Sequence, residues 1–127
     1  MNTVAVRNVD RGVSIGDQVG LADTWWSRFR GLLGRAGLDA GEGLLLLPCR
    51  GVHMFGMRFP VDLAILDRAG VVVGLYHRIA PGGRTTMHRD AWSVLELPAG
   101  VLALTGTAIG DRLEWDGPPA RLKERHQ

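Results

Sequence analysis

A carboxylate lies inside the most strand-like run of the chain, Val61–Leu66, and this combination constrains the fold more than any other feature. The run is short and rich in branched residues, follows Pro60, and ends at the turn-like stretch Asp67–Gly70. Strand alternation places Asp62 with the other even-numbered positions, and both faces of the run are otherwise apolar. Because an unpaired buried charge is costly, we expect an arginine or several backbone N–H groups beside Asp62.

Six other segments have the length and pattern of strands, and together they indicate the fold class. The seven predicted strands are 3–7, 13–21, 44–48, 61–66, 71–79, 92–97 and 112–115. One longer helix is predicted from Asp23 or Thr24 to about Arg35, and a short helical turn at 98–106. We therefore expect a mainly β (α+β) domain, a small β-barrel-like or strongly curved sheet of about seven strands with helices packed at its side.

The composition is that of one folded domain. At 127 residues, 46% of them hydrophobic, the chain can bury a core, and we expect a domain at 1–116 with a loosely held tail at 117–127. Its 15 basic and 13 acidic residues are scattered, which argues against a nucleic-acid surface. A single cysteine, Cys49, excludes an internal disulfide framework. The N-terminus has neither a signal-like nor a membrane-spanning apolar run, so we expect a cytoplasmic protein.

Two acids in apolar strands form the candidate site. Glu96 lies between two leucines in the strand 92–97, much as Asp62 lies between apolar neighbours. We expect both to converge on one enclosed pocket and to hydrogen-bond a small ligand beside an apolar wall. The basic candidates around this pocket are Arg30, Arg35, Arg58 and His53. An alternative stays open, in which each acid is a structural anchor that ties a loop or an arginine into the fold.

Two further chemistries are open to these residues, hydrolysis and metal binding. The two acids could serve a hydrolase, but we favour a non-catalytic role because no nucleophile elbow, phosphate loop or zinc-type motif accompanies them. The soft ligands Cys49, His53, Met54 and Met57 could suit Cu(I), yet methionines beside phenylalanines are more typical of core packing, so we expect no metal or other cofactor. His88, in a polar loop, is expected to be solvated.

Three stretches in series resemble a known family. They are Arg30–Arg35, His53–Asp62 running on to Asp67, and Val94–Gly100 with Ile109–Asp111. In this order and spacing they resemble the bacterial and archaeal family known only as domain of unknown function 192. The resemblance implies a small β-barrel-like domain with a ligand-binding cleft of unassigned ligand, and many members are exported. Carried over by position, the polar signature of the family falls on Arg35, Met57, Asp62, Glu96 and Asp111.

The function that the sequence favours is a small-ligand-binding or interaction module. The alternative from another class is a partner-binding accessory protein, which would use an exposed apolar patch around Trp25, Trp26 or Trp92 in place of a pocket. The sequence specifies neither the ligand nor the oligomeric state.

Overall fold

Seven strands form one sheet in the computed structural model of the chain, which describes residues 3–22, 37–49, 59–81, 83, 85 and 88–116. The strands are β1 (Thr3–Asn8), β2 (Val13–Ala22), β3 (Glu42–Leu46), β4 (Val61–Leu66), β5 (Val72–Ile79), β6 (Ser93–Pro98) and β7 (Leu113–Trp115). The predicted mainly β fold of about seven strands is confirmed. The longer helix expected to end near Arg35 and the tail at 117–127 lie outside the described residues, so they and the domain division stay predictions.

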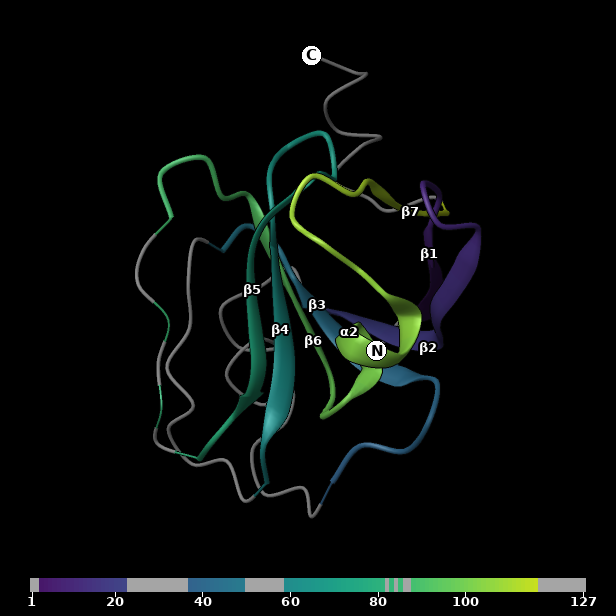
Figure 1. The fold of residues 1–127 in the computed structure, drawn as a ribbon, viewed down its shortest axis with the longest axis vertical. Helices are drawn as coiled ribbons and strands as arrows, with labels where there is room; N and C mark the ends of the chain where they lie inside the picture. The colour runs from purple at the N-terminus through teal and green to yellow at the C-terminus, as the bar shows by residue number, and fades with distance from the viewer. Residues whose placement is uncertain are drawn as a thin grey trace.

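The sheet curls into a half-barrel. Its strand order is β5-β4-β6-β3-β2-β1-β7, and every pair is antiparallel except β2 and β3. The two edges approach each other at one point, where Val71 bridges to Arg112 and the N–H of Val72 donates to the carbonyl of Asp111 at 2.8 Å. Figure 1 shows the curl, with β5 and β4 on one side and β1 and β7 on the other.

One short helix, α2 (Val101–Thr105), follows β6 and corresponds to the helical turn predicted there. It is bounded by Gly100 (φ 101°) and Gly106 (φ 69°), two residues in the left-handed region that glycine adopts without steric penalty. Across the described ranges, no helix has both the length and the apolar character needed to cross a membrane.

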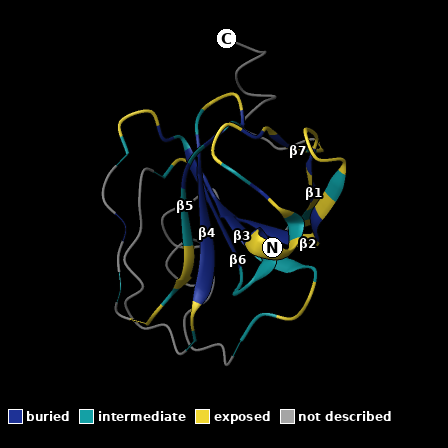
Figure 2. Ribbon diagram, viewed as in Figure 1, coloured by how far each residue is buried: buried dark blue, intermediate teal, exposed yellow. Residues whose placement is uncertain are grey.

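Each face of the sheet carries an apolar cluster. On one face, here named the α2 face, α2 packs against β2 and β6 within the curl (Figure 1). Its buried residues include Val19, Leu45, Ala64, Leu95, Leu97 and Leu102. The opposite face, here named the Glu96 face, buries Leu44, Leu46, Val61, Leu63, Ile65 and Val94. Because both faces are covered, β4 is buried at all six positions, as the dark blue ribbon in Figure 2 shows.

Candidate functional site

The Asp62 carboxylate is fully buried and accepts three backbone hydrogen bonds. Its Oδ1 accepts from the N–H of Arg78 at 2.8 Å. Its Oδ2 accepts from the N–H groups of Gly100 at 3.0 Å and Leu102 at 2.9 Å. The prediction that several backbone N–H groups surround this carboxylate is therefore confirmed.

The three donors come from a β-bulge in β5 and from the start of α2. Val61 pairs with Ile79 whereas Leu63 pairs with Tyr76, so β5 has one extra residue opposite Asp62, which is a β-bulge. The second donor group is the start of α2, which has no side-chain cap of its own. Asp62 reaches from β4 to satisfy N–H groups that the start of a helix leaves unpaired. The fold itself uses three of the roughly four acceptor positions of the Asp62 carboxylate. This is the arrangement expected if Asp62 is a structural anchor.

Glu96 lies on the opposite face of the sheet from Asp62. In the register of β4 and β6, Asp62 pairs with Leu97 and Leu63 pairs with Glu96. Paired residues share a face and successive residues alternate, so this offset of one residue separates the two carboxylates. The prediction that they converge on one pocket is wrong. A hydrolase built on this pair is excluded for the same reason, because its two acids must flank one bond.

Glu96 is a buried acid whose carboxyl group has no hydrogen bond or ion pair among the residues that the structure describes. The residue is 6% exposed. Burial raises the pKa of Glu96 from its usual 4.5 to about 8, because an apolar environment disfavours the charged form. The carboxyl group is therefore mostly protonated at neutral pH, with both a donor and an acceptor to offer.

A row of paired residues crosses the Glu96 face. Tyr76 pairs with Leu63, Leu63 pairs with Glu96, and Glu96 pairs with Leu44. Adjacent strands lie about 4.8 Å apart, so the Cα atoms of Tyr76 and Glu96 are roughly 10 Å apart across Leu63. A tyrosine and an acid therefore flank a leucine on the same face.

Tyr76 is hydrogen-bonded to His88, a histidine that the sequence did not assign to the candidate site. The Tyr76 hydroxyl and His88 Nε2 are 2.8 Å apart, and the two rings meet edge to face. Gly74 leaves room for this contact, since a Cβ at that position would stand 2.6 Å from His88 Cε1. His88 is half-buried and therefore less solvated than predicted. The signal available in the sequence is the glycine two positions before Tyr76 on the same face.

Asp111, the last residue of the family signature, joins two turns. Its Oδ2 accepts from Arg11 Nε at 2.8 Å, from Asn8 Nδ2 at 3.0 Å and from the N–H of Ala108 at 2.9 Å. The hydrogen bond from Arg11 is the main reason why the pKa of Asp111 is lowered to about 2. This network ties the β1–β2 turn to the segment before β7, so Asp111 is a second structural anchor.

The other candidates lie outside the described residues and stay predictions: Arg30, Arg35, Arg58, His53 and Met57. Two of the soft metal ligands, His53 and Met54, lie there as well. Within the described ranges, no group of three or more His, Cys, Asp or Glu side chains is arranged to hold a metal ion.

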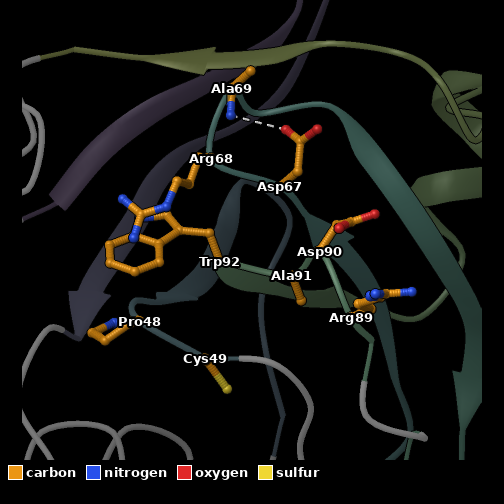
Figure 3. Close-up of a pocket in the computed structure, with 9 residues that line it drawn as sticks. All are labelled: Pro48, Cys49, Asp67, Arg68, Ala69, Arg89, Asp90, Ala91 and Trp92. Carbon is orange, nitrogen blue, oxygen red and sulfur yellow. Dashed lines mark hydrogen bonds between the residues drawn. The ribbon is translucent and has the colours of Figure 1, made fainter.

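A groove with a volume of about 530 Å³ lies where three turns meet at one end of the sheet (Figure 3). The turns follow β3, join β4 to β5, and precede β6. The lining residues are Pro48, Cys49, Asp67, Arg68, Ala69, Arg89, Asp90, Ala91 and Trp92. They come from three segments of the sequence, and no local pattern predicted that these segments meet in one groove.

The sequence matches the family DUF192, described as an uncharacterized ACR, over residues 6–115. Among curated proteins, it is 31% identical over 104 residues to a UPF0127 protein of Thermococcus sibiricus. The matched region is 78% of this chain and 66% of that protein. It is also 32% identical over 112 residues to a UPF0127 protein of Pyrococcus furiosus. That matched region is 86% of this chain and 96% of the Pyrococcus protein.

Two crystal structures have a similar fold. A protein of unknown function from Novosphingobium aromaticivorans superposes with a TM-score of 0.75 at 24% identity, over 89% of this chain and 84% of that one. A Sinorhizobium meliloti protein, provisionally named a transcription regulator, superposes with a TM-score of 0.72 at 27% identity, over 91% of this chain and 93% of that one. Because the Novosphingobium protein is only 24% identical to this chain, its similarity supports the fold alone.

Proposed function

The chain belongs to the DUF192 family, and on that premise we propose that it is a non-catalytic small-ligand-binding protein whose polar contact is Glu96. The observation that carries this proposal is the burial of the Glu96 carboxyl group without a partner among the described residues. Buried polar groups in native proteins are nearly always hydrogen-bonded, so an exception needs a physical reason. A ligand that completes the hydrogen bonding of the carboxyl group supplies one.

The surroundings of Glu96 indicate the kind of ligand. Its neighbours in the row are Leu63 and Leu44, and Tyr76 lies beyond Leu63. A protonated carboxyl group in such a setting suits a molecule with an apolar body and a polar group that both donates and accepts. The predicted ligand contacts that lie outside the described residues remain part of this proposal: Arg30, Arg35, Arg58, His53 and Met57.

Native mass spectrometry of the protein purified from its own host tests the proposal. We expect a retained small molecule that is lost in Glu96→Leu, because leucine fits the apolar face but cannot hydrogen-bond. Glu96→Gln should keep part of the retention, because an amide resembles a protonated carboxyl group. Glu114→Gln, at an exposed acid on β7, is the matched control. Equal retention by Glu96→Leu and the unaltered protein would contradict the proposal.

A partner-binding accessory protein is the second candidate, and one observation favours it. Leu104 on α2 is 87% exposed and Ile109, in the loop before β7, is 66% exposed. Exposed apolar side chains of this size can mark a protein interface when they form a patch. The same spectra discriminate the two candidates, because a protein partner adds a macromolecular mass that Glu96→Leu leaves in place and Leu104→Ser removes.

A further inference from the structure

On the premise of the proposed function, we propose that the Glu96 site takes an electrically neutral molecule with a flat amide edge. Such an edge has an N–H group and a carbonyl oxygen on the same side, as in a primary amide or a lactam. The row of paired residues that contains Glu96 carries this assignment, since it defines the charge, the shape and the hydrogen bonds that a ligand must match. The row runs across β5, β4, β6 and β3 (Figure 1).

The neighbours of Glu96 offer a ligand neither charge nor hydrogen bonds. Leu63 and Leu44 lie on either side of it in the row, and Val94 precedes it on the same face of β6. A cationic ligand would form a buried ion pair with Glu96 here, and without further hydrogen bonds such a pair does not offset the cost of desolvation. An anionic ligand would meet an acid and receive no cation from these neighbours. A neutral ligand avoids both penalties.

Access to the Glu96 side chain is narrow. Glu96 is 6% exposed, whereas Leu63 beside it and Ser93 on the same strand are fully buried. A group that reaches the carboxyl group through so small an opening must be thin. An amide meets this condition, because resonance holds its atoms close to one plane.

The carboxyl group of Glu96 presents two different hydrogen-bonding groups at neutral pH. Because burial raises its pKa to about 8, an O–H donor stands beside a C=O acceptor. An amide edge has the complementary order, since its carbonyl oxygen accepts from the O–H while its N–H donates to the C=O. Both groups of Glu96 are then paired. A ketone or an ester has no N–H and leaves the carbonyl oxygen of Glu96 without a donor.

The other titratable groups around this face have partners inside the fold. Among the described residues they are Glu42 on β3, Cys49 after β3, and Tyr76 on β5 with His88 packed against it, and β4 contributes none. Glu42 Oε1 accepts a backbone N–H from its own turn at 2.8 Å, and the Tyr76 hydroxyl is 2.8 Å from His88 Nε2. Glu96 differs from these groups in having no partner among the described residues.

Tyr76 favours an aromatic body beside the amide. It is half-buried, and its Cα atom lies roughly 10 Å from that of Glu96 across Leu63. Its hydrogen bond to His88 holds the ring in place. A ring attached to the amide can therefore meet the ring of Tyr76, and such aromatic pairs are favourable beyond the area that they bury.

Three probes of the same shape test the class of ligand: benzamide, acetophenone, which lacks the N–H, and benzamidine, which is a cation. Each is titrated into the full chain at pH 6 and followed by the methyl signals of Leu44 and Leu63 in carbon–proton NMR. We expect benzamide to bind about tenfold tighter than acetophenone and tighter than benzamidine. Equal binding of benzamide and acetophenone, a preference for benzamidine, or no saturable shift with any probe would overturn the proposal.

Repeating the titrations at pH 9 tests the protonated form of Glu96. A pKa of about 8 leaves about a tenth of the carboxyl groups protonated at pH 9, so benzamide should bind about tenfold more weakly while benzamidine gains. Benzamide binding that is the same at both pH values contradicts the proposal.

Variants assign the effect to Glu96. Glu96→Leu should abolish the preference for benzamide over acetophenone. Glu96→Gln should keep part of that preference and lose its pH dependence, because a side-chain amide also pairs with benzamide and does not titrate. Glu114→Gln, at an exposed acid on β7, is the matched control and should behave like the unaltered protein. A pH dependence that persists in Glu96→Gln would belong to another group on this face and would contradict the proposal.

The class of ligand and the proposed function can fail separately. If native mass spectra show a molecule that Glu96→Leu loses, while benzamide and acetophenone bind equally well, the class is wrong and the Glu96 site stands. If no retained molecule depends on Glu96 and no probe gives a saturable shift, both are wrong.

Discussion

The two faces of the sheet each bury one carboxyl group, and the two groups are in opposite states. On the α2 face, Asp62 accepts three backbone hydrogen bonds and joins β4, β5 and α2. On the other face, Glu96 is almost as buried, yet no described residue bonds to its carboxyl group. Burial alone therefore does not identify a functional acid. What distinguishes the two is whether the fold itself provides the partners.

Asp62 therefore stabilises the fold, whereas the carboxyl group of Glu96 is left to bind a molecule that is not part of the fold. Removing Asp62 leaves one buried and two part-buried N–H groups without an acceptor, and this destabilises the folded state. Replacing Glu96 takes away a desolvated ionisable group and leaves no described partner unpaired. The two faces should therefore respond to substitution with opposite signs, and four experiments examine that contrast.

The largest expected effect is that of Asp62→Ala. Three N–H groups lose their acceptor, one of them buried and two part-buried, and each unsatisfied buried group costs about 1–3 kcal/mol, so we expect the free energy of unfolding to fall by about 3–5 kcal/mol. Urea unfolding followed by circular dichroism measures it. Asp62→Asn keeps one acceptor oxygen and should lose less. A loss under about 1 kcal/mol for Asp62→Ala would break the comparison.

Glu96→Gln should have the opposite sign and should depend on pH. The folded pKa of about 8 lies above the usual 4.5, so the favourable contribution of the protonated acid is complete below pH 4.5 and is lost as pH rises toward 8. The unaltered protein should lose stability over this window, on the order of a few kcal/mol, whereas Glu96→Gln should not.

Urea unfolding of both proteins at pH 5 and pH 8 measures the effect. The variant should be the more stable of the two at pH 8, and the difference should be small at pH 5. If the difference between the proteins is the same at both pH values, the raised pKa of Glu96 is wrong. Glu114→Gln controls for the loss of an exposed carboxylate.

Asp111 is a third acid to compare with Asp62 and Glu96, and it differs from both in being paired with an arginine, Arg11. Its folded pKa of about 2 lies below the usual 3.8, so its stabilisation is complete above pH 3.8 and is lost as pH falls toward 2. Asp111→Asn should lower the free energy of unfolding by roughly 1–2 kcal/mol at pH 7 and by much less at pH 2. Urea unfolding at both values tests this, and a loss that does not change with pH would contradict it.

The smallest effect is expected at Arg78, in the bulge opposite Asp62. Its φ of 52° is unfavourable for a residue with a side chain, and its contact with Asp62 is made by the backbone N–H. Arg78→Gly should therefore change stability by at most about 1 kcal/mol, with a gain if the relief of strain exceeds the added freedom of the unfolded chain. Thermal unfolding measures the shift, and a loss of several kcal/mol would show that the side chain holds the bulge.

The sequence predicted what depends on local pattern. Short branched runs predicted the strands, and the apolar surroundings of Asp62 predicted that backbone donors or an arginine would satisfy it. Both follow from alternation within one strand and from the energy of a buried charge. Neither requires knowledge of how distant segments pair.

The sequence did not predict what depends on register between distant strands. Whether Asp62 and Glu96 share a face depends on the pairing of β4 with β6, and a shift of one residue would have brought them together. The groove was missed for a related reason, since Arg68 and Trp92 meet only when the turn after β4 folds against the start of β6. Long-range packing determines both arrangements, and no local signal reports it.

The most direct test of the contrast between the two faces is the titration of Glu96 itself. Carbon-detected NMR of the side-chain carboxyl group between pH 4 and pH 10, assigned with Glu96→Gln, reports its pKa without relying on unfolding. The unliganded protein should give a value near 8. A value at or below 4.5 would mean that a partner stabilises the charged carboxylate, and the distinction drawn between the two acids would then be wrong.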